Sequence, residues 1–321
     1  MKKGKALIAV LAAGIIVSVG LLAGCAADTT GPNLQSTAVA LRNSLDAQML
    51  DQYRMVQSWA KAPILLEAAK EAQGYGLNGL YECWSAEATR EYDEGEAVGD
   101  GDAANDISPE ASNFLITSAE VSVVVSDVFI TDYRGYVIAA NGATGDFDQG
   151  PNDWRVFLDE GGKPYFKKHK PEPGGEGWYR KTNESPTRFW AGEAEWDDGW
   201  IAEISLQLRD PDTDEYLGQI KVTFNYGKIA SGIVDRGETY LYEIKVVTPA
   251  GIIAATSEAD QTKVNNEAVN LSNLVFFKEV QTGKTAGFTK ETDEDGEEVY
   301  IGYAVSRDVS KHIIVVSMKA K

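Results

Sequence analysis

Cysteine and histidine, the residues that most often carry nucleophilic and metal chemistry, are scarce in this chain. Its 321 residues include two cysteines, Cys25 and Cys83, and two histidines, His169 and His312. Zinc sites, disulfide frameworks and Cys–His catalysis need more of these residues, or closer spacing, than the chain offers. No nucleophile elbow and no His-Glu-x-x-His motif is present. We therefore expect no metal and no cofactor, and a protein that is not an enzyme.

Carboxylates are abundant, and their number removes their value as a signal for acid–base catalysis. The chain has 49 Asp and Glu against 30 Lys and Arg, a formal net charge of −19 at pH 7. With so many acids any pair could be chosen as a catalytic dyad, so we assign none. The charge argues against nucleic acid as a partner, because a phosphate backbone requires a basic face. Hydrophobic residues make up 43% of the chain, which is enough for a folded core.

Two segments stand out by their local charge. Residues 93–107 are acidic and glycine-rich, which favours a solvated loop over a calcium site on Asp100, Asp102 and Asp106. Residues 161–188 are basic and contain several glycines and prolines, so we expect a loop there as well. This basic island is either solvated or a docking surface for an acidic partner, and the sequence leaves both open. Its members are Lys163, Lys167, Lys168, His169, Lys170, Arg180, Lys181 and Arg188.

Cys25 stands at the end of an export signal. A lysine-rich start is followed by an apolar run over residues 6–22 and then by Leu22-Ala23-Gly24-Cys25. This ending resembles the lipobox of bacterial lipoproteins, which implies that Cys25 carries the lipid and becomes the first residue after cleavage. Residues 1–24 are then the signal peptide and 25–33 a lipidated tether. An uncleaved transmembrane anchor is the alternative, which the glycines and the position of the cysteine disfavour.

The first folded element that the sequence predicts is a long helix. Apolar residues recur in steps of three and four over residues 34–73, which is typical of one buried helix face. Pro63 should kink or interrupt this helix near Ala60, and the glycines from Gly74 onward should end it. A second, shorter helix is expected from Ser108-Pro109-Glu110 to about residue 121, with Ser108 as its N-cap.

The remainder of the chain alternates strands and turns, in two related units. Strand-like residues 123–131 and 136–140 flank a turn that contains Gly135. The same arrangement recurs 116 residues later, where 244–247 and 252–256 flank Gly251. Further strands are predicted at 200–208, 216–226, 288–290, 298–305 and 313–318. Two units of one design indicate an internal repeat.

The order of these elements resembles the double Cache domain, the extracytoplasmic sensor module of bacterial chemoreceptors and histidine kinases. The resemblance rests on the long helix, on Phe129-Ile130-Thr131-Asp132-x-x-Gly135-x-Val137, on Asp146-Phe147-Asp148-Gln149 with Trp154, and on the repeat at 246–255. It implies an α+β fold in which a long N-terminal helix carries two stacked PAS-like antiparallel-sheet modules. Residues 34–108 are then the helical region with the acidic loop, 109–230 the membrane-distal module and 238–318 the membrane-proximal module.

The resemblance also implies where a ligand binds. Amino-acid-binding members carry Tyr-x4-Arg-x-Trp-Tyr and, further on, an Asp that takes the ligand amine. Aligned on Trp154, this chain has Phe147 at the tyrosine position, while the clamping arginine is lost and Arg155 is displaced. Asp197 or Asp198 stands where the amine-binding carboxylate is expected. The implied site residues are therefore Phe147, Trp154, Arg155, Asp197 and Asp198, for an amine, an amino acid or a carboxylate.

The function that these observations favour is small-molecule sensing by a lipid-anchored protein of the bacterial cell envelope that faces the periplasm or the exterior. Family members continue into a transmembrane helix and a signalling module, and this sequence has no apolar run of that kind after Leu22. We therefore expect no transmembrane output of its own, and a separate transmembrane signalling protein as partner. The alternative is a structural or protein-interaction lipoprotein whose Cache fold holds no ligand.

Overall fold

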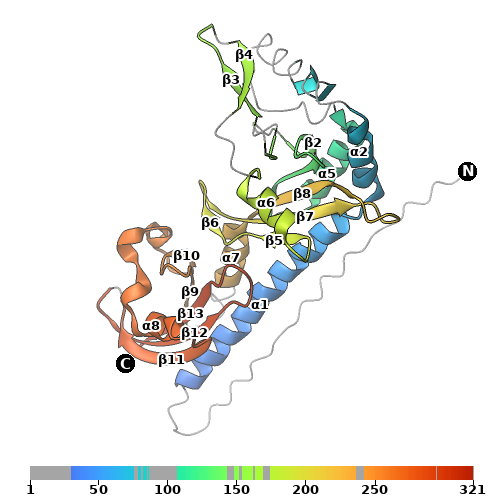
Figure 1. Ribbon diagram of the computed structural model, residues 1–321. Coiled ribbons are helices and arrows are strands. Elements are labelled where there is room, and N and C mark those ends of the chain that lie inside the picture. Colours follow the sequence, from blue (N-terminus) through green and yellow to red (C-terminus); the bar gives the residue numbers. More distant parts are fainter. Residues whose placement is uncertain are drawn as a thin grey trace, which may run out of the picture.

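The computed structural model shows one long helix that runs along two antiparallel sheets (Figure 1). The structure describes residues 30–75, 79, 80, 82–84, 86, 107–142, 148–151, 154–161, 163–168, 174–235, 242–293 and 295–320. The acidic segment 93–107, apart from Ile107, lies outside these residues, as do the export signal, Cys25 and His169. In the described part of the chain, no helix has the length and apolarity needed to cross a bilayer.

The predicted long helix is two helices. Helix α1 (Thr30–Trp59) is 30 residues long and buries one face, including Leu34, Leu45 and Val56. Helix α2 (Pro63–Gly74) follows after three residues and has its proline in the first turn. Pro63 therefore interrupts the helix as predicted, because proline lacks the N–H that a continuous helix needs and is tolerated in a first turn. Helix α1 contacts strands of both sheets and so holds them together.

The first sheet is formed by strands that lie between Val125 and Asn225. Its strand order is β2-β1-β8-β7-β5, and β6 pairs with β7 at one edge. Helices α2 and α5 (Pro109–Val121) pack on one face, and α6 (Gly177–Glu184) contacts β5 and β7. The strands are β1 (Val125–Asp132), β2 (Val137–Ala140), β5 (Phe189–Ala191), β6 (Glu195–Trp196), β7 (Trp200–Arg209) and β8 (Tyr216–Asn225). The first sheet with these three helices is called the first module below.

The second sheet has the strand order β10-β9-β13-β12-β11. Helix α7 (Tyr226–Val234) connects the two sheets and contacts both α1 and β10. Helix α8 (Val275–Gln281) and the short 3-10 helices η2 (Gln261–Lys263), η3 (Glu267–Val269) and η4 (Leu271–Asn273) follow β10. The strands are β9 (Glu243–Val247), β10 (Ile253–Thr256), β11 (Ala286–Thr292), β12 (Glu298–Val305) and β13 (Ile313–Lys319). The second sheet with α8 and the 3-10 helices is called the second module.

The two turns that contain Gly135 and Gly251 have the same hydrogen bonds, which is direct structural evidence of the repeat. The Gly135 N–H donates to the Asp132 carbonyl at 3.1 Å, and the Gly251 N–H donates to the Thr248 carbonyl at 2.9 Å. Both glycines have positive φ, 103° and 86°. A side chain at Gly135 would also collide with the backbone of Gly150. Glycine is required at both turns because other residues seldom adopt this conformation.

Two details differ from the sequence-based expectation. Ser108 precedes α5, but its side chain makes no capping hydrogen bond. The basic island is not one loop, because β4 (Pro164–Lys168) pairs with β3 (Trp154–Leu158) and α6 follows. The hairpin of β3 and β4 projects away from both sheets (Figure 1). Pro164 is compatible with a strand here because it is the first residue of β4, where a proline is tolerated.

Candidate functional site

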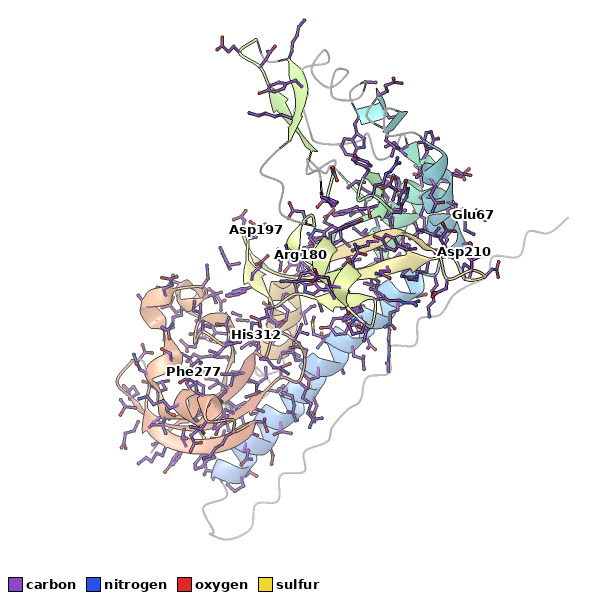
Figure 2. All side chains as sticks on the ribbon, in the orientation of Figure 1. Glu67, Arg180, Asp197, Asp210, Phe277 and His312 are labelled. Carbon is purple, nitrogen blue, oxygen red and sulfur yellow. The ribbon has the colours of Figure 1, made fainter. Side chains whose placement is uncertain are left out.

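The described residues that the resemblance implied for the site lie in two places. Asp197 and Asp198 are exposed in the turn between β6 and β7, and Figure 2 shows Asp197 at that edge of the first sheet. Trp154 and Arg155 begin strand β3 of the projecting hairpin. Phe147 lies outside the described residues. The pocket built from these five residues therefore stays a prediction, and no described contact joins its members.

The two faces of the first sheet differ in chemistry. One face carries buried apolar side chains, including Val128, Ile130 and Val222, and packs on α2 and α5. Apart from Phe129, the opposite face is polar over three adjacent strands, and the register places its residues in three rows across β1, β8 and β7. The rows are Asp127–Thr223–Glu203, Phe129–Lys221–Ser205 and Thr131–Gln219–Gln207. These nine residues are called the polar face.

The polar face is largely covered. Thr131, Ser205 and Gln219 are fully buried, and Thr223 is nearly so. Burying a polar group costs free energy unless it finds a hydrogen-bond partner, so buried polar residues on one face are informative. A sheet that needed only a core would place apolar residues there, as the opposite face of the same strands does.

One end of the polar face is a hydrogen-bond network centred on Gln219. Its amide nitrogen donates to the Tyr179 carbonyl at 3.1 Å and to the Tyr216 hydroxyl at 3.2 Å. Its amide oxygen accepts from the Ser205 hydroxyl at 3.2 Å. The Tyr216 hydroxyl donates to that of Tyr179 at 3.3 Å. Burial raises the pKa of both tyrosines, so both remain neutral donors at physiological pH.

The other end of the polar face is charged. Lys221 Nζ lies 2.5 Å from Glu203 Oε1, and both side chains are largely buried. Asp127 is the neighbour of this pair, and burial raises the pKa of its carboxyl, while Lys221 acts in the opposite direction. The Lys221 ammonium group thus pairs with Glu203 and acts on the Asp127 carboxyl by its charge. Lys221 Nζ also lies 5.4 Å from the centre of the Trp178 ring of α6 and 5.8 Å from that of Phe129.

The equivalent face of the second sheet is closed. Glu243, Lys245 and Val247 of β9 stand 116 residues after Asp127, Phe129 and Thr131. Most of this face is apolar and is filled by Leu271, Phe276 and Phe277. Glu243 and Lys245 remain as polar residues at one end, where they belong to an ion-pair network. The first module therefore offers groups that suit a small polar ligand, and the equivalent face of the second module does not.

Two cavities flank the polar face. One, of about 650 Å³, lies at the Gln219 end and is lined by Tyr133, Arg134, Tyr179, Gln207, Arg209 and Tyr216, among others. The other, of about 700 Å³, lies between the modules and reaches Glu203. Both have volumes typical of sites for small molecules.

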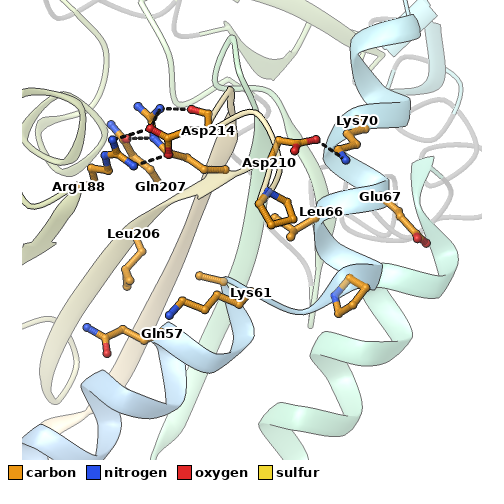
Figure 3. A pocket seen from close by; sticks show the side chains of 14 residues that line it. Gln57, Lys61, Leu66, Glu67, Lys70, Arg188, Leu206, Gln207, Asp210 and Asp214 are labelled. Carbon is orange, nitrogen blue, oxygen red and sulfur yellow. Dashed lines mark hydrogen bonds and ion pairs between the residues drawn. The ribbon is translucent and has the colours of Figure 1, made fainter.

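A third cavity, of about 650 Å³, lies at the corner between α1 and α2 (Figure 3). Most of its charged residues are already paired with each other. Lys70 Nζ lies 2.5 Å from Asp210, and both terminal nitrogens of Arg188 donate to Asp214 at 2.6 and 2.7 Å. This cavity is therefore a weaker candidate. In the described part of the chain, no group of three or more His, Cys, Asp and Glu side chains could hold a metal ion.

Comparison with known proteins gives similarity in structure alone. No protein-family model and no curated protein matches the sequence. The extracellular domain of a protein described as the histidine kinase vpHK1S-Z8 superposes with a TM-score of 0.55 at 12% identity, over 91% of this chain and 93% of that chain. The ligand-binding domain of the Campylobacter jejuni chemoreceptor Tlp3 gives 0.52 at 9% identity, over 91% and 94%. The fold is the double Cache fold.

The polar face of this double Cache fold was missed by reasoning from the sequence. Its signal was present as alternation, because Glu203, Ser205 and Gln207 take every second position of one strand. Such alternation is ordinarily the mark of a solvent-exposed face. This face is buried because helix α6 packs over it. No local pattern in the sequence predicts that contact.

Proposed function

We propose that this protein is an extracytoplasmic sensor that binds a small polar molecule in its first module, at the polar face. The observation that carries the proposal is the burial of uncharged and charged polar groups on one face of the first sheet, next to two cavities. The second module has an apolar filling at the equivalent place. A binding function, and not a catalytic one, fits a set of hydrogen-bonding groups that includes no activated nucleophile.

Solved double Cache domains support the class of ligand. The Tlp3 domain has been crystallised with L-valine and with isoleucine. Because those proteins are about 9% identical to this chain, the likeness supports small-molecule binding and not a particular amino acid. An amine, an amino acid or a carboxylate each matches some of the groups on the polar face, which offers amide, hydroxyl, ammonium and carboxylate atoms.

The anchor is the second part of the proposal. Cys25, at the end of the lipobox, would carry the lipid that holds the protein on a bacterial membrane. The bound state would then be read by a separate transmembrane signalling protein. Replacing Cys25 by Ser should abolish labelling of the protein with a radioactive fatty acid in growing cells, and a variant that is still labelled at this end would contradict the anchor.

The binding site is tested by a thermal-shift screen with amino acids, amines and carboxylates, followed by calorimetry on each compound that raises the melting temperature. We expect Gln207→Ala and Lys221→Met to weaken binding of such a compound about tenfold or more, because each removes a hydrogen-bonding group of the face and Gln207 also lines one of the cavities. Lys290→Met changes an exposed lysine of the second sheet and is the matched control. Unchanged affinity in both folded first-sheet variants would place the site elsewhere.

A further inference from the structure

The cavity between the two modules has walls from both of them. The first module contributes β5, β6 and the segment that joins them, and the second module contributes the loop between β12 and β13. The two walls touch where the backbone N–H of Ala194 donates to the Ser310 hydroxyl at 3.3 Å. A molecule in this cavity would therefore contact both modules at once. The cavity is called the inter-module cavity; its lining includes Lys181, Trp190, Glu193, Glu195, Glu203 and Lys311.

Carboxylates and an aromatic ring dominate the chemistry of the inter-module cavity. Glu193, Glu195, Glu203 and Trp190 all line it, together with Lys181 and Lys311. Among the described residues, neither Glu193 nor Glu195 forms an ion pair. Lys311 donates to the Arg307 carbonyl at 3.2 Å, so its ammonium group is directed to its own loop. A cation that enters the cavity would meet carboxylates without a described partner.

Two lysine side chains already show how this surface holds an alkylammonium group. Lys181 Nζ lies 5.3 Å from the centre of the Trp190 ring. Lys221 Nζ lies 2.5 Å from Glu203 and within cation–π distance of Trp178 and Phe129. A carboxylate combined with an aromatic face is the arrangement that recognises alkylammonium ligands. Each lysine is thus an internal equivalent of an amine ligand.

The charge balance at Glu203 favours a second cation. Asp127 and Glu203 lie in one row of the polar face, and Lys221 of the next row pairs with Glu203 and acts on Asp127 by its charge. An additional ammonium group beside Glu203 would offset the second carboxyl group. The net charge of −19 for the chain also attracts cations toward the surface.

We propose that the inter-module cavity binds an aliphatic amine, with its ammonium groups on the glutamates and its methylene chain on the Trp190 ring. This inference rests on the proposed function, because Glu203 belongs both to the polar face and to the cavity. It adds the class of ligand, an aliphatic amine, and it adds that the bound ligand bridges the two modules. Lys181 of the first module and Lys311 of the second both line the cavity and oppose the ligand by their charge, so both tune its affinity.

The test is calorimetry on the purified full chain with 1,4-diaminobutane as the probe. 1,4-Butanediol has the same carbon chain without charge, and succinate has the opposite charge. We expect the diamine to bind and both comparison compounds to bind at least about tenfold more weakly, because they lack the ammonium groups. Equal binding of the diol, or no binding of the diamine, would overturn the proposal.

Variants place the diamine in the cavity. Glu193→Gln and Trp190→Leu should each weaken its binding about tenfold, and Lys311→Gln should strengthen it severalfold because a repelling charge is removed. Glu298→Gln changes an exposed glutamate of the second sheet and should leave binding unchanged. Glu203→Gln leaves Lys221 unpaired and is interpreted only if the variant melts cooperatively. Diamine affinity that is the same in Glu193→Gln, Trp190→Leu and Lys311→Gln would overturn the assignment.

The experiments distinguish failure of the amine inference from failure of the sensor proposal. If an amino acid or a carboxylate binds and depends on Gln207 while the diamine does not bind, the amine inference is wrong and the sensor proposal stands. If no compound of the screen and no diamine binds, both are wrong.

Discussion

The imidazole of His312 lies on the phenol ring of Tyr226, with ring centres 4.6 Å apart. His312 belongs to the loop before β13 of the second sheet, and Tyr226 begins α7 directly after the first sheet. Figure 2 shows His312 between the two modules. The His312 ring is fully buried, and its centre lies 6.2 Å from that of Trp200 in an edge-to-face arrangement. Neither of its nitrogens has a hydrogen-bond partner among the described residues. This contact between the two modules therefore buries a histidine side chain in its neutral form.

Because His312 is buried, the free energy of unfolding should depend on pH. Burial lowers the pKa of His312 to about 3 from its ordinary 6.5. A group whose pKa is lowered in the folded state takes up its proton first in the unfolded state. The contribution of His312 to the free energy of unfolding should therefore fall as the pH falls from about 6.5 toward 3, by about 2 kcal/mol between pH 6.5 and pH 5. Glu243, described below, changes stability in the opposite direction over this range, so the His312 contribution is measured as the difference between the parent and a variant without His312 in urea unfolding.

His312→Phe should remove this dependence, because phenylalanine keeps an aromatic ring against Tyr226 and carries no titrating nitrogen. His169→Gln changes the other histidine and should keep the full pH dependence of the parent. A His312→Phe variant that loses stability in acid as steeply as the parent would show that other groups are responsible.

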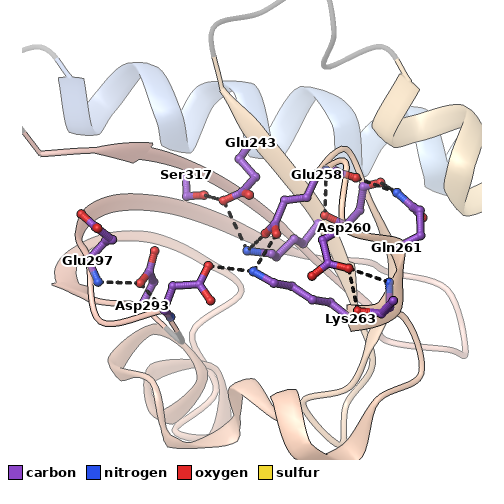
Figure 4. A network of polar contacts seen from close by, with 12 residues as sticks. Glu243, Glu258, Asp260, Gln261, Lys263, Asp293, Glu297 and Ser317 are labelled. Carbon is purple, nitrogen blue, oxygen red and sulfur yellow. Dashed lines mark hydrogen bonds and ion pairs between the residues drawn. The ribbon is translucent and has the colours of Figure 1, made fainter.

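The second module is closed at one end by an ion-pair network around Glu258 (Figure 4). Lys245 Nζ lies 2.5 Å and Lys263 Nζ 2.7 Å from its carboxylate oxygens. Burial alone would raise the pKa of Glu258, but a hydrogen bond with Glu243, followed by these two lysine contacts, holds it down to about 2. Glu258→Gln would leave the buried Lys245 with Glu243 alone. We expect a loss of about 2–3 kcal/mol in the free energy of unfolding, toward the lower end of the range for broken buried pairs. Glu298→Gln, in an exposed pair, should cost less than about 0.5 kcal/mol, so an equal loss in both variants would contradict this role.

Glu243 in the same network should have the opposite pH dependence to that of His312. Burial, followed by the nearby Glu258, raises the pKa of Glu243 to about 7 from its ordinary 4.5. The folded state then keeps a proton that the unfolded state has lost, so stability falls as the pH rises from about 4.5 through 7. Glu243→Gln should be more stable than the parent at pH 8, by about 1 kcal/mol after allowance for solvent screening, and no more stable at pH 4. A constant difference between the two proteins at both pH values would rule this out.

Asp132 and Thr248 occupy equivalent turns and should differ in how much they contribute to the free energy of unfolding. The Asp132 carboxylate accepts from the backbone N–H groups of Arg134, Gly135 and Tyr136 at 2.8–3.0 Å and from the Arg134 side chain at 2.6 Å. Asp132→Ala should cost about 3 kcal/mol, because buried donors lose their acceptor. The Thr248 hydroxyl accepts two backbone bonds, so Thr248→Ala should cost about 1 kcal/mol. Chemical denaturation of both variants checks the order, and a larger loss for Thr248→Ala would contradict the comparison.

Local elements and their repetition followed from the sequence. Pro63 breaks the helix because its ring and missing N–H act locally, whatever the rest of the chain does. Gly135 and Gly251 mark equivalent turns because the positive φ they supply is a property of the residue itself. The α+β class and the resemblance to the double Cache domain follow from the order of such elements, and the structure confirms both.

What surrounds each strand was decided by tertiary structure. The alternation of Glu203, Ser205 and Gln207 is the same whether that face meets water or α6, so the sequence could not show that the polar face is covered. The ring contact of His312 with Tyr226 joins residues 86 positions apart in the chain, and no local pattern encodes it. Asp197 and Asp198 were chosen by resemblance, yet the turn after β6 leaves both exposed. Side-chain chemistry is local, whereas burial and partnership depend on segments that only folding brings together.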